Sequence, residues 1–219
     1  MSIVTIARGS YSRGKEVAER LAKKLGYECI SRDILLEASE EFNIPEIKLV
    51  RMLHDCPKIL DRLFDGSERY VKYYRSALLQ HARNDNMVYH GLAGHFFLKD
   101  IPHVLKIRIN ADMETRVQEE MHREKISAAE ALQVLKKDDE ERRKWSLEVY
   151  GVDTWDSRLY DMVINISTLT LEDAVDIIYE VLQKPTFRST SESRKLVADL
   201  ALAAKKQADT LKAMGSTLF

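Results

Sequence analysis

The chain has 219 residues, of which 45% are hydrophobic and 32% charged, and its formal net charge is −1. These values are typical of a globular protein that can bury a sizeable core. They exclude a strong general attraction to nucleic acid or anionic membranes, so any anion site must be local.

No apolar run approaches the roughly 20 residues that a membrane-spanning helix needs, and no charged-then-apolar leader opens the sequence. The two cysteines, Cys29 and Cys56, lack the spacing of a metal motif and are typical of thiols in a reducing compartment. We therefore expect a cytoplasmic protein without a nucleic-acid or membrane partner.

The first elements follow in a strand–helix order. Residues 3–7 predict a buried strand, and residues 15–25 predict a helix that Gly26 ends. Residues 27–42 predict a short strand, a turn from Ser31 to Asp33 and a second helix. A mostly helical stretch then runs to about Arg83, with breaks at Pro57 and at Asp65-Gly66.

The second half repeats this order. Three segments predict strands: "NMVYHG", "HVLKIRINA" and "DMVINIS". Helices are predicted over residues 92–99, over 113–145 with a break near Ser127, and over 170–184, where Thr170 and Asp173 form a capping pattern. Strands separated by helices indicate a parallel sheet covered on both faces, which is a three-layer α/β fold.

The carboxyl-terminal part is set apart by composition. Residues 185–193 are polar and rich in turn formers, which predicts a linker, so we expect one domain over 1–184 and a linker with a terminal helix over 185–219. This helix has an apolar stripe formed by Leu196, Leu200, Ala204 and Leu211. Two interpretations stay open: docking on its own domain, or assembly of a homo-oligomer.

A phosphate-binding loop is predicted between the first strand and the first helix. The stretch from Gly9 to Lys15, GSYSRGK, satisfies GxxxxGK. In that context backbone amides and the helix dipole converge on an anion, and the lysine reaches distal phosphates. The Ser or Thr that normally binds Mg²⁺ is replaced by Glu16. The alternative is a simple helix start with a surface lysine.

Three segments resemble a known group: "ARGSYSRGKEVAERLAKKLG", "ISRDILLEASEE" and "DDEERRKWSLEVYGVDTWDSRLYDMVINISTLTLEDAVDIIYEVL". Over about residues 1–183 the chain resembles the cytidylate kinase-like proteins, relatives of bacterial cytidylate kinase among the P-loop nucleoside monophosphate kinases. That group commonly has Glu after the loop's basic residue. The resemblance implies a P-loop NTPase-type sheet, a monophosphate-binding insertion within 33–83 and an arginine-bearing lid within 123–150.

The resemblance also implies an activity: transfer of the γ-phosphate of ATP to CMP or dCMP with Mg²⁺. Such chemistry depends on positioning and on neutralising charge, for which arginines are suited. The implied catalytic residues are Lys15, Arg123 and Arg142. The implied cofactor-binding residues are Gly9, Ser10, Ser12, Arg13, Gly14, Lys15, Glu16 and Arg158. The candidate substrate-binding residues are Arg32, Asp33 and His90.

Each assignment has a plainer alternative. Arg123 and Arg142 lie among acidic residues, where pairing on a solvated helix would explain them. The tyrosines of residues 70–74 either line an acceptor pocket or only pack their helix. Leu92 stands where related kinases carry an arginine, with His90 and His95 nearby.

Glu16 also leaves Mg²⁺ without its usual hydroxyl ligand, so Ser10, Ser12 or water would have to supply an oxygen. Three functions stay open: a phosphotransferase, which we prefer; a nucleotide-binding regulatory protein without transfer activity; and a partner-binding α/β protein with a vestigial loop.

Overall fold

The computed structural model describes residues 2–9, 12–31, 33–42, 67–91 and 93–215. Its centre is a parallel sheet of five strands in the order β2-β3-β1-β4-β5. The strands are β1 (Ile3–Arg8), β2 (Glu28–Ile30), β3 (Met87–His90), β4 (Val104–Asn110) and β5 (Met162–Asn165). The predicted strands and their parallel arrangement are confirmed.

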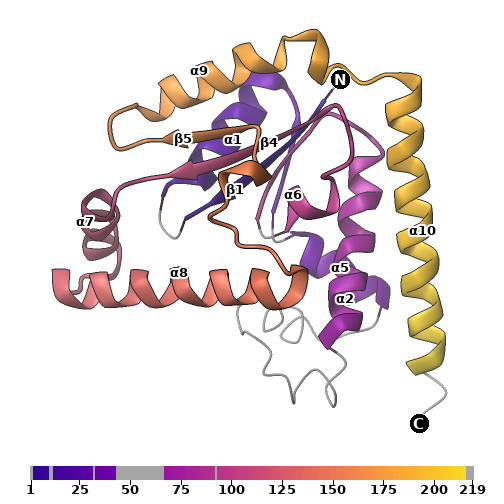
Figure 1. Ribbon diagram of the computed structural model, residues 1–219, viewed down its shortest axis with the longest axis horizontal. Helices are drawn as coiled ribbons and strands as arrows, with labels where there is room; N and C mark the ends of the chain where they lie inside the picture. The colour runs from indigo at the N-terminus through magenta and orange to yellow at the C-terminus, as the bar shows by residue number, and fades with distance from the viewer. Residues whose placement is uncertain (1, 10–11, 32, 43–66, 92, 216–219) are drawn as a thin grey trace.

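Helices cover both faces of this sheet (Figure 1). One face packs against α1 (Gly14–Leu25) and α9 (Leu171–Leu182), and its core includes Val4, Ile6 and Ile107. The other face packs against α5 (Ser67–Ala82) and α6 (Gly94–Phe97), and its core includes Ile3, Met87 and Tyr89. Alternate residues of β1, β3 and β4 thus feed two separate cores, as the predicted three-layer fold requires.

The remaining helices lie around these layers. α2 (Asp33–Phe42) packs on α5, and α10 (Ser191–Gly215) packs along the outer side of α5 (Figure 1). α7 (Met113–Glu124) and α8 (Ala128–Tyr150) contact each other, and the short helices η1 (Ser157–Leu159) and η2 (Pro185–Phe187) lie in connections. None of the described helices is long and apolar enough to span a bilayer.

Capping residues set several helix boundaries. Ser127 forms a capping box with Glu130 at the start of α8, which confirms the predicted break, and Thr170 forms another with Asp173 on α9. α8 continues past the predicted end at residue 145 and stops at Gly151, whose φ of 68° favours glycine.

Two predicted boundaries were wrong. The helix expected over residues 92–99 is described only as α6, because turn hydrogen bonds such as Ile101 N to Leu98 O lead the chain into β4. The linker expected over 185–193 contains η2, and α10 already begins at Ser191. The predicted breaks at Pro57 and Asp65-Gly66 lie outside the described residues, as does Cys56.

The predicted apolar stripe of the terminal helix was partly wrong. The residues of α10 that enter the core are Val197, Ala201, Ala204 and Ala208, with Leu200 and Leu211 partly buried. Leu196 is instead 46% exposed. α10 therefore docks on its own chain through a narrow stripe rich in alanine, which lets the helix approach α5 closely.

Candidate active site

A cavity of about 310 Å³ opens at the carboxyl ends of the central strands. Its walls include Arg8 at the end of β1 with Gly9 after it, His90 at the end of β3 with Gly91 after it, and Arg108 on β4. Residues of α6, α8 and the segment 154–160 complete it. Ligands of parallel α/β sheets bind at this edge, so the cavity lies where the fold predicts a site.

The loop between β1 and α1 is held in place from within. The buried Ser12 hydroxyl contacts the carbonyl oxygens of Gly9 and Ile109 at 3.0 and 2.9 Å, and Gly9 N donates to Ile109 O at 3.2 Å. A Cβ on Gly14 would lie 2.9 Å from the Cβ of Arg8, so only glycine fits there. Ser12 therefore braces the loop rather than lining the cavity, and Ser10 lies outside the described residues.

The first turn of α1 is open to an anion. Its N-cap, Arg13, makes no side-chain cap hydrogen bond, so amides of the first turn lack that partner. Lys15 lines the cavity and is 60% exposed, and its ion-pair contact among the described residues is with Glu19, at 3.6 Å. Together these groups fit the phosphates of a nucleotide.

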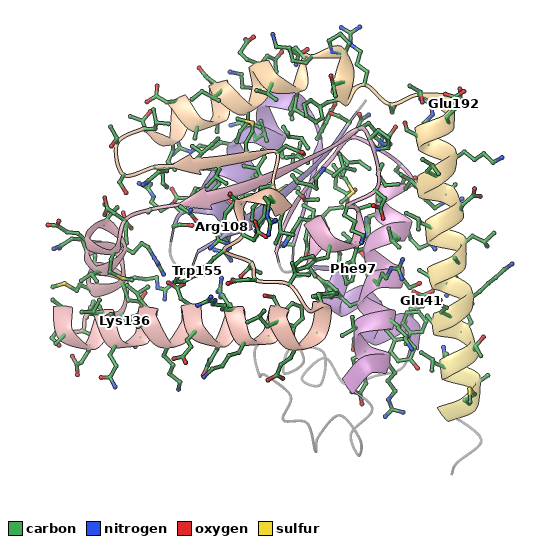
Figure 2. All side chains as sticks on the ribbon, in the orientation of Figure 1. Glu41, Phe97, Arg108, Lys136, Trp155 and Glu192 are labelled. Carbon is green, nitrogen blue, oxygen red and sulfur yellow. The ribbon has the colours of Figure 1, made fainter. Side chains whose placement is uncertain are left out.

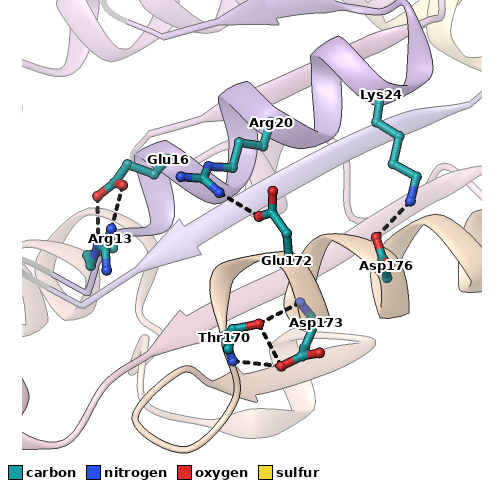
Figure 3. A network of polar contacts seen from close by, with 8 residues as sticks. All are labelled: Arg13, Glu16, Arg20, Lys24, Thr170, Glu172, Asp173 and Asp176. Atoms are coloured by element: carbon teal, nitrogen blue, oxygen red, sulfur yellow. Dashed lines mark hydrogen bonds and ion pairs between the residues drawn. The ribbon is translucent and has the colours of Figure 1, made fainter.

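Glu16 points to Arg13 rather than to the cavity. Arg13 donates through Nε and Nη2 to the two carboxylate oxygens of Glu16, at 2.8 and 2.7 Å (Figure 3). This hydrogen-bonded guanidinium lowers the pKa of Glu16 below its usual value. At the position where a metal-binding hydroxyl is usual, this chain has Glu16, which is ion-paired with Arg13.

The structure separates the predicted arginines. Arg142 lines the cavity, and its Nη1 lies 3.5 Å from the carbonyl oxygen of Arg8. Arg123 instead contacts Glu120 and Glu124 on its own helix, at 3.0 and 2.9 Å, and does not line the cavity. Arg158 is 87% exposed and pairs with Asp156, also away from the cavity.

Of the predicted acceptor-binding residues, His90 is buried and lines the cavity. Arg32 and Leu92 lie outside the described residues. Asp33 begins α2, and its side chain is not described.

Sequence reasoning missed Arg116 and Asp139. Arg116, on α7, is buried and pairs with Asp139 of α8 at 2.8 Å. Its Cζ lies 3.9 Å from where a Cβ on Gly9 would stand, so the pair joins α7 and α8 beside the loop. Both residues occur in highly charged helices, where no sequence pattern distinguishes them from solvated neighbours.

An aromatic wall was also missed. Tyr74 of α5 and Tyr89 of β3 line the cavity and hydrogen-bond through their hydroxyls, and Phe96, Trp145, Trp155 and Tyr160 line it as well. Burial raises the pKa of Tyr74 to about 12, so its hydroxyl is protonated at neutral pH. Tyr70 and Tyr73 are packed into the core, which favours the plainer interpretation of those two tyrosines.

The cavity offers little for a metal. The described residues contain no group of three or more His, Cys, Asp or Glu side chains that could hold an ion. Asp139 is the acidic side chain among the described residues that line the cavity, and it is already paired with Arg116. A magnesium ion that is bound mainly by nucleotide phosphates and water needs only one or two protein oxygens. The described cavity residues fit a magnesium ion of that kind and not one that is held by protein side chains alone.

Known proteins are similar to this chain over most of its length. A model of the cytidylate kinase-like family matches residues 3–168. A cytidylate kinase from Sulfolobus acidocaldarius is 28% identical over 187 residues, covering 84% of this chain and 96% of the relative. A cytidylate kinase from Archaeoglobus fulgidus is 26% identical over 183 residues, covering 82% and 94%.

Solved structures share the fold. An uncharacterized protein from Eubacterium ventriosum superimposes with a TM-score of 0.65 at 21% identity, covering 84% of this chain and 99% of that one. A shikimate kinase from Bacteroides thetaiotaomicron gives a TM-score of 0.53 at 12% identity, covering 84% and 99%. Because the family model spans well over half of its length, this chain belongs to the cytidylate kinase-like family.

Proposed function

We propose that this protein, a nucleotide kinase by family, transfers the γ-phosphate of ATP to CMP or dCMP in the cavity beside the β1–α1 loop. The observation that carries the proposal is the make-up of that cavity. The cavity is lined by residues of the loop, by Lys15 and Arg142, and by several aromatic side chains. Cationic side chains suit polyphosphate, and flat aromatic side chains suit a nucleotide base.

In this mechanism the loop amides and Lys15 hold the donor phosphates. An oxygen of the acceptor phosphate attacks the γ-phosphorus, and the bond from that phosphorus to the β,γ-bridging oxygen breaks, so the products are ADP and either CDP from CMP or dCDP from dCMP. Arg142 lies where it can neutralise charge on the transferred group. Bound Mg²⁺ would supply further neutralisation, held mainly by phosphate oxygens and water, with Asp139 as the cavity's carboxylate.

A regulatory protein that binds nucleotide without transfer is the second candidate. The Arg13–Glu16 pair favours it, because this pair occupies the place of the metal-binding hydroxyl. In that case the loop would bind ATP, but the acceptor end would be idle.

One assay separates the two. Phosphoryl transfer is measured with ATP and Mg²⁺ against CMP, dCMP, UMP, AMP and GMP, with thermal shifts recorded for each ligand. We expect turnover with CMP or dCMP that chelation of Mg²⁺ abolishes. A thermal shift with ATP but no turnover with any acceptor would contradict the proposal and favour the regulatory protein.

A further inference from the structure

Arg108 is a half-buried arginine of the cavity wall that makes no ion pair with a described residue. Its Nε donates to Asn110 Oδ1 at 2.9 Å, and its Nη1 donates to the carbonyl oxygen of Thr154 at 3.0 Å and lies 3.4 Å from the Tyr160 hydroxyl. These neutral acceptors hold the guanidinium plane in place. Nη2 has no hydrogen-bond partner among the described residues, so its donors and the positive charge are left for a ligand.

Five other arginines differ in this respect. Carboxylates pair with Arg13, Arg116, Arg123, Arg143 and Arg158. Arg108 helps to lower the pKa of Asp153, but that carboxylate is ion-paired with Arg143. A cation that is partly removed from water without its own paired carboxylate is costly unless an anion reaches it. The arrangement therefore indicates an anion-binding role for Arg108 rather than a purely structural one.

The alternation of side chains along β4 places Arg108 on the opposite sheet face from α1, which follows the phosphate-binding loop. Ile107 and Ile109 enter the core that α1 and α9 cover, so the alternation of β4 turns Arg108 to the opposite sheet face, which carries α5 and α6. Lys15 belongs to α1 on the first face. Of the cationic side chains that line the cavity, Lys15 thus belongs to the loop side and Arg108 to the other sheet face, and Arg8 and Arg142 line it as well.

The surroundings of Arg108 suit a nucleotide. Its guanidinium lies 5.8 Å from the ring centre of Tyr160, and Phe96 and Trp155 also line the cavity; Figure 2 shows Arg108 and Trp155 on the side of the sheet that faces α8. Burial, then Arg108 and Lys106, lower the pKa of His95 to about 3, so that ring adds no positive charge at neutral pH. Lys106 pairs with Asp161 at 3.0 Å and does not line the cavity.

We infer that Arg108 binds the phosphate of the acceptor nucleotide and positions it for attack on the donor held at the loop. The inference rests on the proposed function, because it requires a phosphorylated acceptor. Nη2 can donate two hydrogen bonds to phosphate oxygens, while Thr154 and Asn110 keep the guanidinium oriented. Sequence motifs gave no indication of this residue, since it lies inside a strand and not in a loop.

The test uses the full chain with Arg108→Met, Arg108→Lys and the matched control Lys106→Met. Lys106 lies two residues away on the same strand and face, but outside the cavity. Steady-state kinetics give KM for CMP and for ATP, and calorimetry compares the affinity of CMP with that of cytidine, which lacks the phosphate. Thermal unfolding is followed for each variant.

We expect Arg108→Met to raise KM for CMP at least about tenfold, as loss of a charge-assisted contact implies, with KM for ATP changed less than about twofold. CMP should lose its affinity advantage over cytidine, Arg108→Lys should recover part of it, and Lys106→Met should behave as wild type. If Arg108→Met does not fold, Arg108→Lys is compared with wild type by the same criteria.

Equal rises in both KM values, the same defect in Lys106→Met, or an unchanged preference for CMP over cytidine would overturn the inference while leaving the proposed function intact. If wild type transfers nothing to CMP, the proposed function fails separately. The binding of the other nucleoside monophosphates to wild type and to Arg108→Met is then compared by calorimetry. If wild type binds one of them and Arg108→Met does not, the inference is supported. If both proteins bind it equally, or wild type binds none, the inference is overturned.

Discussion

At the scale of single residues, the loop shows how one substitution is accommodated. Glu16 would bring a negative charge to a phosphate site, yet Arg13 holds its carboxylate in a two-point hydrogen-bonded pair outside the cavity. The lysine beside it, Lys15, stays available, because its ion-pair contact within the described part of the chain, with Glu19, is long and exposed. The altered motif is therefore compatible with phosphate binding.

We predict that Lys15→Ala lowers ATP affinity at least about tenfold, because it removes a charged donor to the phosphates. The melting temperature should be unchanged, since the side chain is 60% exposed. Calorimetric titration with ATP measures the effect. Lys23→Ala, an exposed lysine at the far end of the same helix, is the matched control. Unchanged ATP affinity in Lys15→Ala would remove the loop from the site.

At the scale of elements, one glycine after β3 and one in the short helix α6 leave room for Tyr89 in the aromatic wall of the cavity. A Cβ on Gly94 would lie 2.4 Å from Cδ1 of Tyr89, and one on Gly91 would lie 2.4 Å from the Tyr89 hydroxyl oxygen. Tyr89 is 1% exposed, so it has no room to withdraw. The two glycines leave room for this ring, whose hydroxyl hydrogen-bonds with that of Tyr74.

We predict that Gly94→Ala destabilises the protein by about 1–3 kcal/mol through overpacking, and that it raises KM for the acceptor because Tyr89 lines the cavity. Denaturant unfolding and steady-state kinetics measure the two effects. In the control Gly26→Ala, the new Cβ meets nothing within 4 Å, and only the positive φ of 68° is strained. That variant should lose about 1 kcal/mol without a change in KM. A wild-type KM in Gly94→Ala would show that Tyr89 does not shape the acceptor end.

At the scale of the whole molecule, α10 acts as a brace for the helices beside the cavity. It lies beyond the family match and packs on α5 through its alanine stripe. Gln80 Nε2 donates to the Ala201 carbonyl oxygen at 3.3 Å, and Lys212 Nζ donates to the Glu41 carbonyl oxygen at 2.6 Å. Lys205 also pairs with the Glu41 carboxylate. The helix thus ties α2 to α5, which supplies Tyr74 to the cavity.

We predict that Ala201→Asp destabilises the protein by at least about 2 kcal/mol, because an unpaired carboxylate would enter a site that is 0% exposed. Its neighbour Leu202 is 54% exposed, so Leu202→Asp should leave the unfolding free energy nearly unchanged. Denaturant titration compares the two, and gel filtration of Leu202→Asp tests self-association through the exposed side. Equal stability of both variants would contradict the docking; a smaller oligomer in Leu202→Asp alone would indicate a homo-oligomer formed by α10.

The sequence by itself determined the alternating strands and helices, the loop between β1 and α1, and the caps at Ser127 and Thr170. These depend on local periodicity and on contacts within a few residues. Only the tertiary structure decided which charged side chains meet. Arg108 lines the cavity and Arg116 lies beside Gly9 of the loop, while Arg123 and Arg158 remain with carboxylates of their own segments. That outcome depends on how helices rotate and on which strand face a residue occupies, because contacts between distant segments leave no pattern in the local sequence.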